Sequence, residues 1–189
     1  MLLADILPFT RSLVEKAVRP GDVVIDATMG NGHDTLFLAK LVGPTGAVLA
    51  YDIQEAALEA TKQRLEKEGV LGHVRLYKKG HETVAQELRQ LNRPVSAAMF
   101  NLGYLPGSDK RVVTKPDTTL AALEAIAPYL KPGGLITVVV YTGHDGGQEE
   151  GDALLARLSL WDHQHYHILQ YRFLNRPNHP PYLVAIQKA

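Results

Sequence analysis

The 189-residue chain has no cysteine, no net charge and no long apolar run. The missing cysteine excludes disulfides, thiolate metal sites and any mechanism with a cysteine nucleophile. Zero net charge means that RNA binding would need a local basic patch, because the total charge gives no long-range attraction. A membrane helix needs ~20 consecutive apolar residues. The longest strongly apolar run, residues 135–141, suits a buried strand instead.

The length predicts a single domain, residues 1–189, because a chain of this size buries roughly 70% of its unfolded surface. The N-terminal sequence lacks a basic leader and carries Asp5 within its apolar part, which argues against a signal peptide. Its apolar spacing predicts helical segments interrupted at Pro8. We expect residues 1–20 to form an N-terminal helical segment that packs on the domain.

Strand-like and helix-like stretches alternate along most of the chain, which predicts an α/β fold with a mostly parallel sheet and helices on both faces. The C-terminal pair of strands has only a short turn between its members and predicts an antiparallel hairpin that closes one edge. Residues 143–152 are loop-like and are expected to be a turn that leads into a helix. About seven strands are expected, at 23–29, 47–53, 74–79, 96–102, 135–141, 165–175 and 182–189, with helices at 35–41, 55–68, 82–91 and 117–130.

A glycine-containing loop follows the first strand and precedes a helix. Two glycines permit a tight turn and close approach of a ligand to the backbone, and a helix N-terminus offers free N–H groups, with Asp34 or Thr35 as the expected cap. A glycine pair alone also occurs in loops that bind nothing. The candidate cofactor-binding residues of this loop are Asp26, Thr28, Gly30, Asn31 and Gly32.

Asp52 ends the second strand, twenty residues after Gly32. A carboxylate there is placed to accept hydrogen bonds from both ribose hydroxyls of an adenosine cofactor, with Gln54 near the ribose or adenine. The alternative is that Asp52 caps the next helix. After the third strand, Gly80 and His81 are candidates for the adenine edge, although this turn equally suits a helix cap.

S-adenosylmethionine and a nicotinamide dinucleotide share this ribose recognition. Asp26, at the end of the first strand, suits the ammonium group of S-adenosylmethionine, directly or through water, whereas it would repel a pyrophosphate. The third glycine of the dinucleotide fingerprint is also missing, since Thr35 stands there. Both features favour the methyl donor.

The fourth strand ends in Asn101-Leu-Gly-Tyr104, at the point where ligands bind in open α/β sheets. This stretch resembles the Asn/Asp-Pro-Pro-Tyr signature of amino-group methyltransferases, in which the amide orients the target nitrogen and the aromatic ring stacks on the base. Asn101 and Tyr104, the candidate catalytic residues, match it, while Leu102 and Gly103 replace the prolines.

The combination DATMGNGHDT, YDIQ, KGH, FNLGYLPGSDK, LKPGGL and VVVYTGHDGG resembles one family of class I S-adenosylmethionine-dependent methyltransferases with a Rossmann-like fold. Its members were first labelled rRNA methylases and are understood as tRNA wobble-uridine methyltransferases. The resemblance implies N-methylation of 5-aminomethyl-(2-thio)uridine at tRNA position 34 to the 5-methylaminomethyl form. It also implies S-adenosylmethionine as cofactor, a tRNA anticodon stem-loop as partner and a bacterial cytoplasmic setting, with neither metal nor membrane.

An amine nucleophile needs no covalent intermediate, whereas carbon-5 methylation of a pyrimidine normally calls for the cysteine that is absent. An alkylamine with a pKa of about 10.4 is neutral roughly once in 1,000 near pH 7.4, a handicap of roughly 4 kcal/mol. Burial lowers that pKa. Asn101 would accept a hydrogen bond from the neutral amine without adding a charge that stabilises the ammonium form.

The substrate-binding candidates surround this strand end. Tyr104 would stack on or border the uracil, and Lys110, Arg111 and Lys115 would hold anticodon phosphates unless they are ordinary solvated surface.

Tyr141 and His144 follow the fifth strand and are expected to border the same pocket, where they would contact the substrate or help remove the proton, unless His144 is structural. Arg176 lies in the NRPNHPPY turn, which grips RNA or simply connects the hairpin. The competing functions are methylation of rRNA or another base or small-molecule amine, a nicotinamide-dependent oxidoreductase and a non-catalytic binding module. A homodimer would enlarge the RNA-binding surface.

Overall fold

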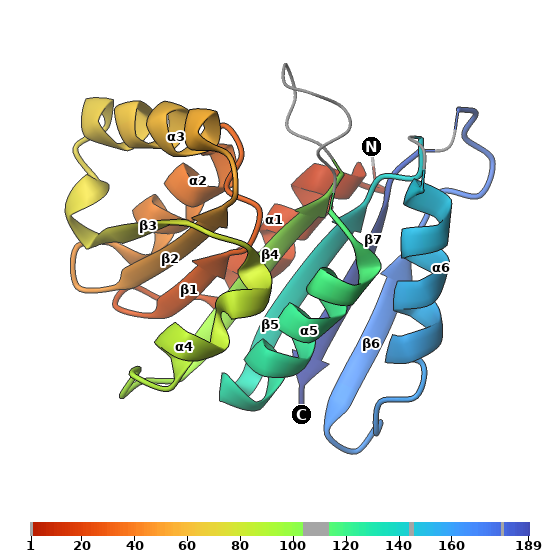
Figure 1. The fold of residues 1–189 in the computed structure, drawn as a ribbon. Coiled ribbons are helices and arrows are strands. Elements are labelled where there is room, and N and C mark those ends of the chain that lie inside the picture. Colours follow the sequence, from red (N-terminus) through yellow and green to blue (C-terminus); the bar gives the residue numbers. More distant parts are fainter. Residues whose placement is uncertain (1, 104–113, 144–145, 179) are drawn as a thin grey trace.

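The computed structural model describes residues 2–103, 114–143, 146–178 and 180–189 (Figure 1). Within these residues, seven strands form one sheet in the order β3-β2-β1-β4-β5-β7-β6. Neighbouring strands from β3 to β5 are parallel, and β7 is antiparallel to both β5 and β6. The strands are β1 (Val23–Asp26), β2 (Ala47–Asp52), β3 (Val74–Lys78), β4 (Val95–Leu102), β5 (Leu130–Val140), β6 (Tyr166–Tyr171) and β7 (Tyr182–Lys188).

The prediction of a mostly parallel sheet with a C-terminal antiparallel pair is confirmed. Of this C-terminal pair, only β6 lies at a sheet edge, because β7 is inserted between β5 and β6. Burial explains this order: residues 182–186 of β7 are all buried, whereas residues 167–170 of β6 are all exposed. An apolar strand belongs inside a sheet that helices cover on both faces.

Helices cover both faces of the sheet, with α1, α2 and α3 on one side and α4, α5 and α6 on the other (Figure 1). Short 3₁₀ turns occupy 71–73, 81–83 and 127–129. The helix predicted at 82–91 is shorter in the structure. These residues form the end of a 3₁₀ turn and then a single helical turn, α4. The α-helices are α1 (Ile6–Ala17), α2 (His33–Val42), α3 (Glu55–Lys67), α4 (Ala85–Leu88), α5 (Pro116–Ile126) and α6 (Gly147–Leu158).

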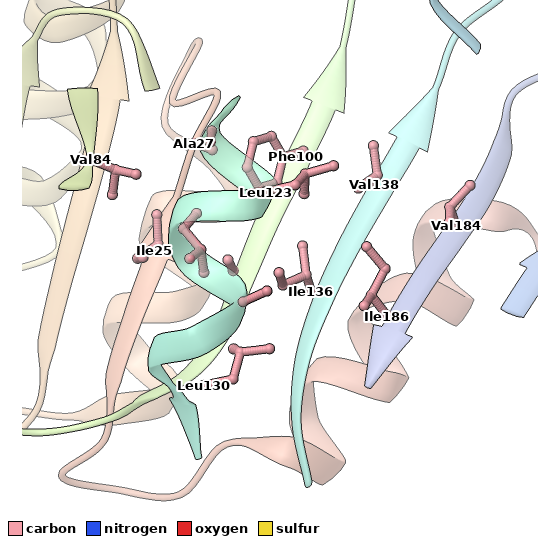
Figure 2. Close-up of a cluster of buried hydrophobic side chains, with 14 of the residues drawn as sticks. Ile25, Ala27, Val84, Phe100, Leu123, Leu130, Ile136, Val138, Val184 and Ile186 are labelled. Atoms are coloured by element: carbon pink, nitrogen blue, oxygen red, sulfur yellow. The ribbon is translucent and has the colours of Figure 1, made fainter. Parts of the chain in front are cut away.

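Two apolar cores form, one on each side of the sheet. Figure 2 shows part of the first, in which Leu123 of α5 lies over Ile25, Phe100 and Ile136 of the strands. On the other face, α1 and α2 contribute to the second core. Burying one large apolar side chain is worth about 1.5–3 kcal/mol, so these cores hold the strand ends in place.

The N-terminal helix contradicts one expectation, because α1 runs without a break through Pro8. Pro8 is the third residue of this helix, where the backbone N–H would have no intrahelical acceptor, so proline is tolerated there. Ile6, Thr10 and Val14 bury one face of α1. The hydroxyl of Tyr171 in β6 also donates to the carbonyl of Ala4, at 2.9 Å, which ties the start of the chain to the far edge of the sheet.

Candidate functional site

Three polar side chains gather where parallel strands end at the carboxyl edge of the sheet: Asp26 ends β1, Asp52 ends β2 and Asn101 is the penultimate residue of β4. The order β3-β2-β1-β4-β5 places the switch between the two halves of the sheet at β1 and β4, where ligands bind in open α/β sheets. There the backbone N–H of Asn101 donates to Thr28 Oγ1 at 2.7 Å. Thr28 thus links the glycine loop to the end of β4.

Gly30 and Gly32 both adopt positive φ, at 52° and 77°, and Gly32 is the N-cap of α2. A Cβ on Gly32 would lie 2.7 Å from Thr61 Oγ1 and 2.9 Å from Thr61 Cα, so the loop packs against α3 too closely for a side chain. The expectation that Asp34 or Thr35 caps α2 is wrong. Left-handed Gly32 takes that position, and both predicted caps fall inside the helix.

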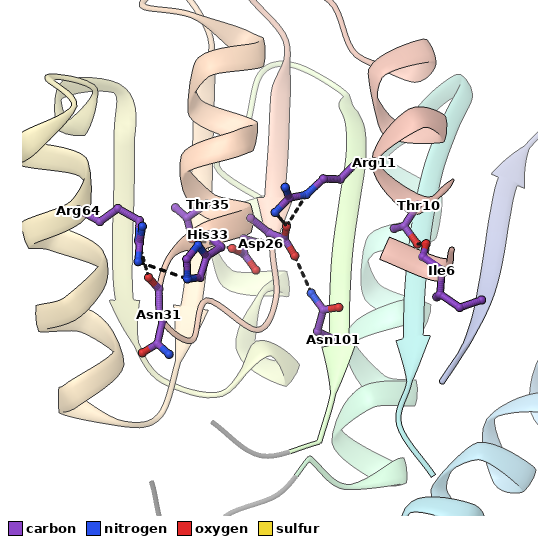
Figure 3. A network of polar contacts seen from close by, with 10 residues as sticks. Ile6, Thr10, Arg11, Asp26, Asn31, His33, Thr35, Arg64 and Asn101 are labelled. Carbon is purple, nitrogen blue, oxygen red and sulfur yellow. Dashed lines mark hydrogen bonds and ion pairs between the residues drawn. The ribbon is translucent and has the colours of Figure 1, made fainter. Parts of the chain in front are cut away.

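Helix α3 also holds the glycine loop through polar contacts of side chains that were not among the predicted site residues. Thr61 Oγ1 donates to the carbonyl of Gly30 at 3.1 Å, and Arg64 Nε donates to the carbonyl of Asn31 at 2.8 Å. Arg64 Nη2 also lies 3.3 Å from Nε2 of His33 (Figure 3). Thr61 and Arg64 are three residues apart on α3 and therefore lie on the same helix face. This spacing was the signal available in the sequence.

Asp26 is fully buried, and its two oxygens accept hydrogen bonds from the hydroxyl of Thr35 at 2.6 Å and from the backbone N–H of Thr28 at 3.2 Å. Burial, and then the negative charge of Asp34, raises the pKa of Asp26 to about 7. Asp26 therefore stabilises the glycine loop through its hydrogen bonds with Thr28 and Thr35. Its contact with a cofactor ammonium stays a prediction.

Asp52 accepts hydrogen bonds from the backbone N–H groups of Gly30, at 3.0 Å, and Gln54, at 2.9 Å. Its side chain does not cap α3, whose N-cap is Gln54. A carboxylate has about four acceptor positions, so Asp52 retains capacity for ribose hydroxyls. Next to it, Ile53 is 57% exposed. This apolar side chain was not among the predicted site residues, although it directly follows the strand-ending carboxylate.

His81 is buried at the start of the 3₁₀ turn that Gly80 precedes. Its Nδ1 lies 2.9 Å from the carbonyl oxygen of Ala27, which can only accept, so Nδ1 carries the proton and Nε2 is an acceptor. Burial lowers the pKa of His81, which favours this neutral form. Among the described residues, Nε2 has no hydrogen-bond partner. His81 therefore offers an unused acceptor, as a contact to the amino group of adenine would require.

The carboxylate of Asp34 orients the side-chain amide of Asn101. Its Nδ2 donates to Asp34 Oδ2 at 2.7 Å, and the other oxygen of Asp34 accepts from Arg11 Nη2 at 2.7 Å (Figure 3). A carboxylate has no proton to donate, so the amide nitrogen must face Asp34. The amide oxygen of Asn101 is buried and has no hydrogen-bond partner in the described part of the chain.

Four predicted residues, Tyr104, Lys110, Arg111 and His144, lie outside the described residues. The segments that flank 104–113 are joined, because the backbone N–H of Gly103 donates to Thr114 Oγ1 at 3.0 Å. The Thr114 hydroxyl in turn donates to Glu150 of α6, at 2.9 Å. The chain just after Asn101 is therefore attached, through Gly103 and Thr114, to helix α6.

The remaining substrate candidates lie in different surroundings. Lys115 is exposed at the N-cap of α5. Tyr141 is half-buried after β5, and burial, followed by the charge of Asp34, raises its pKa. Arg176 pairs with Asp5 at 2.7 Å and stacks at 3.6 Å on the Phe173 ring, so it braces the N-terminus against the turn between β6 and β7.

In the described part of the chain, no cluster of three or more histidine, aspartate or glutamate side chains has the arrangement of a metal site. Likewise, none of the helices formed by the described residues has the length and apolar character to cross a bilayer.

The fold is that of Rossmann-like methyltransferases. A crystal structure from Clostridium thermocellum superimposes with a TM-score of 0.95 at 40% identity, covering 99% of both chains. A Streptococcus mutans structure in complex with SAH gives 0.89 at 37% identity, again covering 99% of each. A more distant O-methyltransferase from Thermotoga maritima, at 20% identity and a TM-score of 0.62, shares the fold.

The family described as "Putative rRNA methylase" matches residues 48–187, and the chain belongs to it. The Clostridium thermocellum protein carries the same description. An Arabidopsis thaliana protein named tRNA (mnm(5)s(2)U34)-methyltransferase, chloroplastic, is 42% identical over 176 residues. The match includes 88% of this chain and 63% of the plant protein, so the chain spans less than two thirds of that relative.

Proposed function

We propose that the protein transfers a methyl group from S-adenosylmethionine to the aminomethyl nitrogen of 5-aminomethyl-(2-thio)uridine at tRNA position 34, giving the 5-methylaminomethyl form. The observation that carries this proposal is the amide oxygen of Asn101 at the switch point, which is oriented by Asp34 and has no hydrogen-bond partner among the described residues. The name of the plant relative supports the substrate. We propose the bacterial cytoplasm as the setting of this reaction, because translation takes place there.

Local charge supports S-adenosylmethionine over a dinucleotide. Asp26, Asp34 and Asp52 lie close enough for the last two to raise the pKa of Asp26, and Arg11 compensates part of this negative charge. S-adenosylmethionine carries a sulfonium and an ammonium against one carboxylate, so it is attracted, whereas a pyrophosphate is repelled. SAH, which the Streptococcus mutans relative binds, is what remains of this donor after methyl transfer.

The described residues fit such a donor. Asp52 has acceptor capacity for the ribose, Ile53 offers an exposed apolar surface, and His81 Nε2 is an unpaired acceptor. Gly30 and Gly32 let the backbone approach a ligand without interference from a side chain. When bound, S-adenosylmethionine supplies an electrophilic methyl group.

Asn101 would act on the nucleophile. A neutral amine donates an N–H to the amide oxygen, and this contact directs the nitrogen lone pair away from Asn101 and toward the methyl group. An uncharged acceptor also avoids stabilising the ammonium form, which is the unreactive one. Methyl transfer forms a C–N bond, breaks the C–S bond and leaves a methylammonium that loses one proton.

The RNA contacts are also part of the proposal. Lys115 is exposed beside the site, and Lys110 and Arg111 precede it in the sequence, so we assign these three to anticodon phosphates. Tyr104 is assigned to the uracil ring. The family description favours rRNA as the alternative substrate, because the same site would serve another nucleobase amine.

The test incubates the protein with methyl-labelled S-adenosylmethionine and either tRNA rich in 5-aminomethyluridine or rRNA, followed by mass spectrometry of the nucleosides. We expect the label in 5-methylaminomethyluridine from tRNA. Asn101→Ala should lower the rate by about 100-fold, whereas Asn92→Ala, which changes an exposed asparagine before β4, should leave it unchanged. Label confined to rRNA or to another nucleoside would refute the substrate.

A further inference from the structure

We propose that Asp34 is a positioning residue that fixes the orientation of the Asn101 amide, and that Arg11 of the N-terminal helix holds Asp34 for this task. This inference rests on the proposed role of Asn101 in accepting a hydrogen bond from the amine. The residues come from three elements, α1, α2 and β4, which meet at the carboxyl edge of the sheet.

The two ends of a carboxamide have nearly the same shape but opposite hydrogen-bonding character. If the Asn101 amide rotated by half a turn, its NH₂ group would face the amine, and two donors would then meet. The 2.7 Å bond from Asn101 Nδ2 to Asp34 Oδ2 opposes this rotation, because the turned amide would bring its oxygen against the carboxylate. Asp34 therefore keeps an acceptor toward the substrate.

Arg11 binds only one of the two carboxylate oxygens of Asp34. Its Nη2 and Nε both donate to Oδ1, at 2.7 Å and 3.2 Å, which leaves Oδ2 for Asn101. The guanidinium also lies 5.2 Å above the Phe37 ring, which limits its movement. Its positive charge offsets the repulsion between Asp34 and the buried carboxyl of Asp26.

A purely structural ion pair would give different results from a positioning residue. Loss of a structural pair lowers stability or donor binding, and it does so whether or not Asn101 is present. Loss of a positioning residue lowers kcat at saturating donor, and it has no further effect once the Asn101 amide is gone. A double-mutant cycle between Asp34 and Asn101 separates the two cases.

The cycle uses Asp34→Ala, Asn101→Ala and the double variant, assayed at saturating S-adenosylmethionine. We expect Asp34→Ala to lower kcat by about 10- to 100-fold, and the double variant to match Asn101→Ala within about twofold. Losses that multiply would overturn the proposal. Asp22→Ala is the matched control, because it removes a similarly shielded carboxylate from an ion pair with Lys131 at the opposite end of β1, and it should retain full activity.

Arg11 is tested in the same assay. Arg11→Gln should lower kcat by about threefold to tenfold, and Arg11→Lys should recover part of that loss, since a lysine ammonium can still hold one carboxylate oxygen. Arg157→Gln, which breaks an exposed ion pair with Glu124 on the α5–α6 surface, is the control. Equal activity of Arg11→Gln and the parent would refute the role of Arg11.

An NMR measurement keeps this proposal separate from the proposed function. The side-chain amide signal of Asn101, identified by its loss in Asn101→Ala, should show one proton shifted downfield by the carboxylate acceptor. Asp34→Ala should remove that shift, and an unchanged signal would overturn the positioning role. If the parent protein methylates no aminomethyluridine, the proposed function fails, while this signal still decides whether Asp34 orients Asn101.

Discussion

Replacing Asp26 with asparagine should change how the stability of the protein depends on pH. The Asp26 carboxyl is fully buried, and its pKa is raised from 3.8 to about 7, first by burial and then by the charge of Asp34. The unfolded chain releases this proton near pH 4, whereas the folded chain keeps it until about pH 7. The contribution of Asp26 to stability is therefore complete at low pH and is lost as pH rises toward 7.

The size of the effect follows from linkage. Between pH 5 and pH 7 the folded state binds up to one more proton than the unfolded state, and each pH unit is then worth about 1.4 kcal/mol. Partial titration near pH 7 reduces the total to about 2 kcal/mol over this interval. The asparagine side chain does not titrate, so the stability of Asp26→Asn relative to the parent should rise by this amount from pH 5 to pH 7.

Urea unfolding of both proteins at pH 5, 6 and 7 measures this difference, with the free energy of unfolding extrapolated to water. Other groups titrate in the same range, including His81, whose pKa burial lowers. Their effects are common to the two proteins and cancel in the difference. A difference that stays constant within about 0.5 kcal/mol, or that falls with pH, would show that Asp26 is ionised in the fold and would refute the reasoning.

Three further substitutions test the glycine loop, the apolar core and a surface ion pair, each by urea unfolding and, for the first, also by calorimetry of donor binding. Gly32→Ala should cost at least about 2 kcal/mol and weaken donor binding, because residue 32 has a φ of 77° and its Cβ would collide with Thr61; unchanged binding would contradict the loop geometry. Phe100→Ala should cost about 3–5 kcal/mol, since that ring is 1% exposed, and a cost under about 1 kcal/mol would contradict the core. Arg157→Ala should cost under about 1 kcal/mol, because both partners of its pair with Glu124 are exposed, and a larger loss would show an unrecognised contact.

The fold was predictable where the pattern was local. The alternation of short apolar runs with helical periodicity located the strands of the sheet, because buried strands need apolar residues wherever the sheet lies. The place of β7 between β5 and β6 was missed, since strand order depends on which faces the helices cover. The continuous apolar run YLVAI of β7, against the mixed HILQ of β6, was the signal available in the sequence, and the structure buries the first and exposes the second.

Side chains at strand ends were predictable for the same reason. Asp52 and Asn101 follow apolar runs, and parallel strands bring their carboxyl ends to one edge of the sheet. Arg11 and Arg64 were not found, because each reaches the site from a helix, and helix docking decides which of many surface cations does so. Arg11 is separated from its partner Asp34 by 23 residues, and Asp34 from Asn101 by 67.

Under the proposed function, the charges around the glycine loop would connect stability, donor choice and catalysis. Asp26, Asp34 and Asp52 repel one another, which is part of why Asp26 holds its proton up to about pH 7. Arg11 offsets this repulsion at Asp34, and the carboxylate of Asp52 is left to attract a ligand that is itself positive. The same Asp34 accepts a hydrogen bond from the Asn101 amide, so in the proposed mechanism this carboxylate would both favour a cationic donor and determine which end of the amide faces the amine. Removing Asp34 would therefore relieve the repulsion on Asp26 and release Asn101 in a single step.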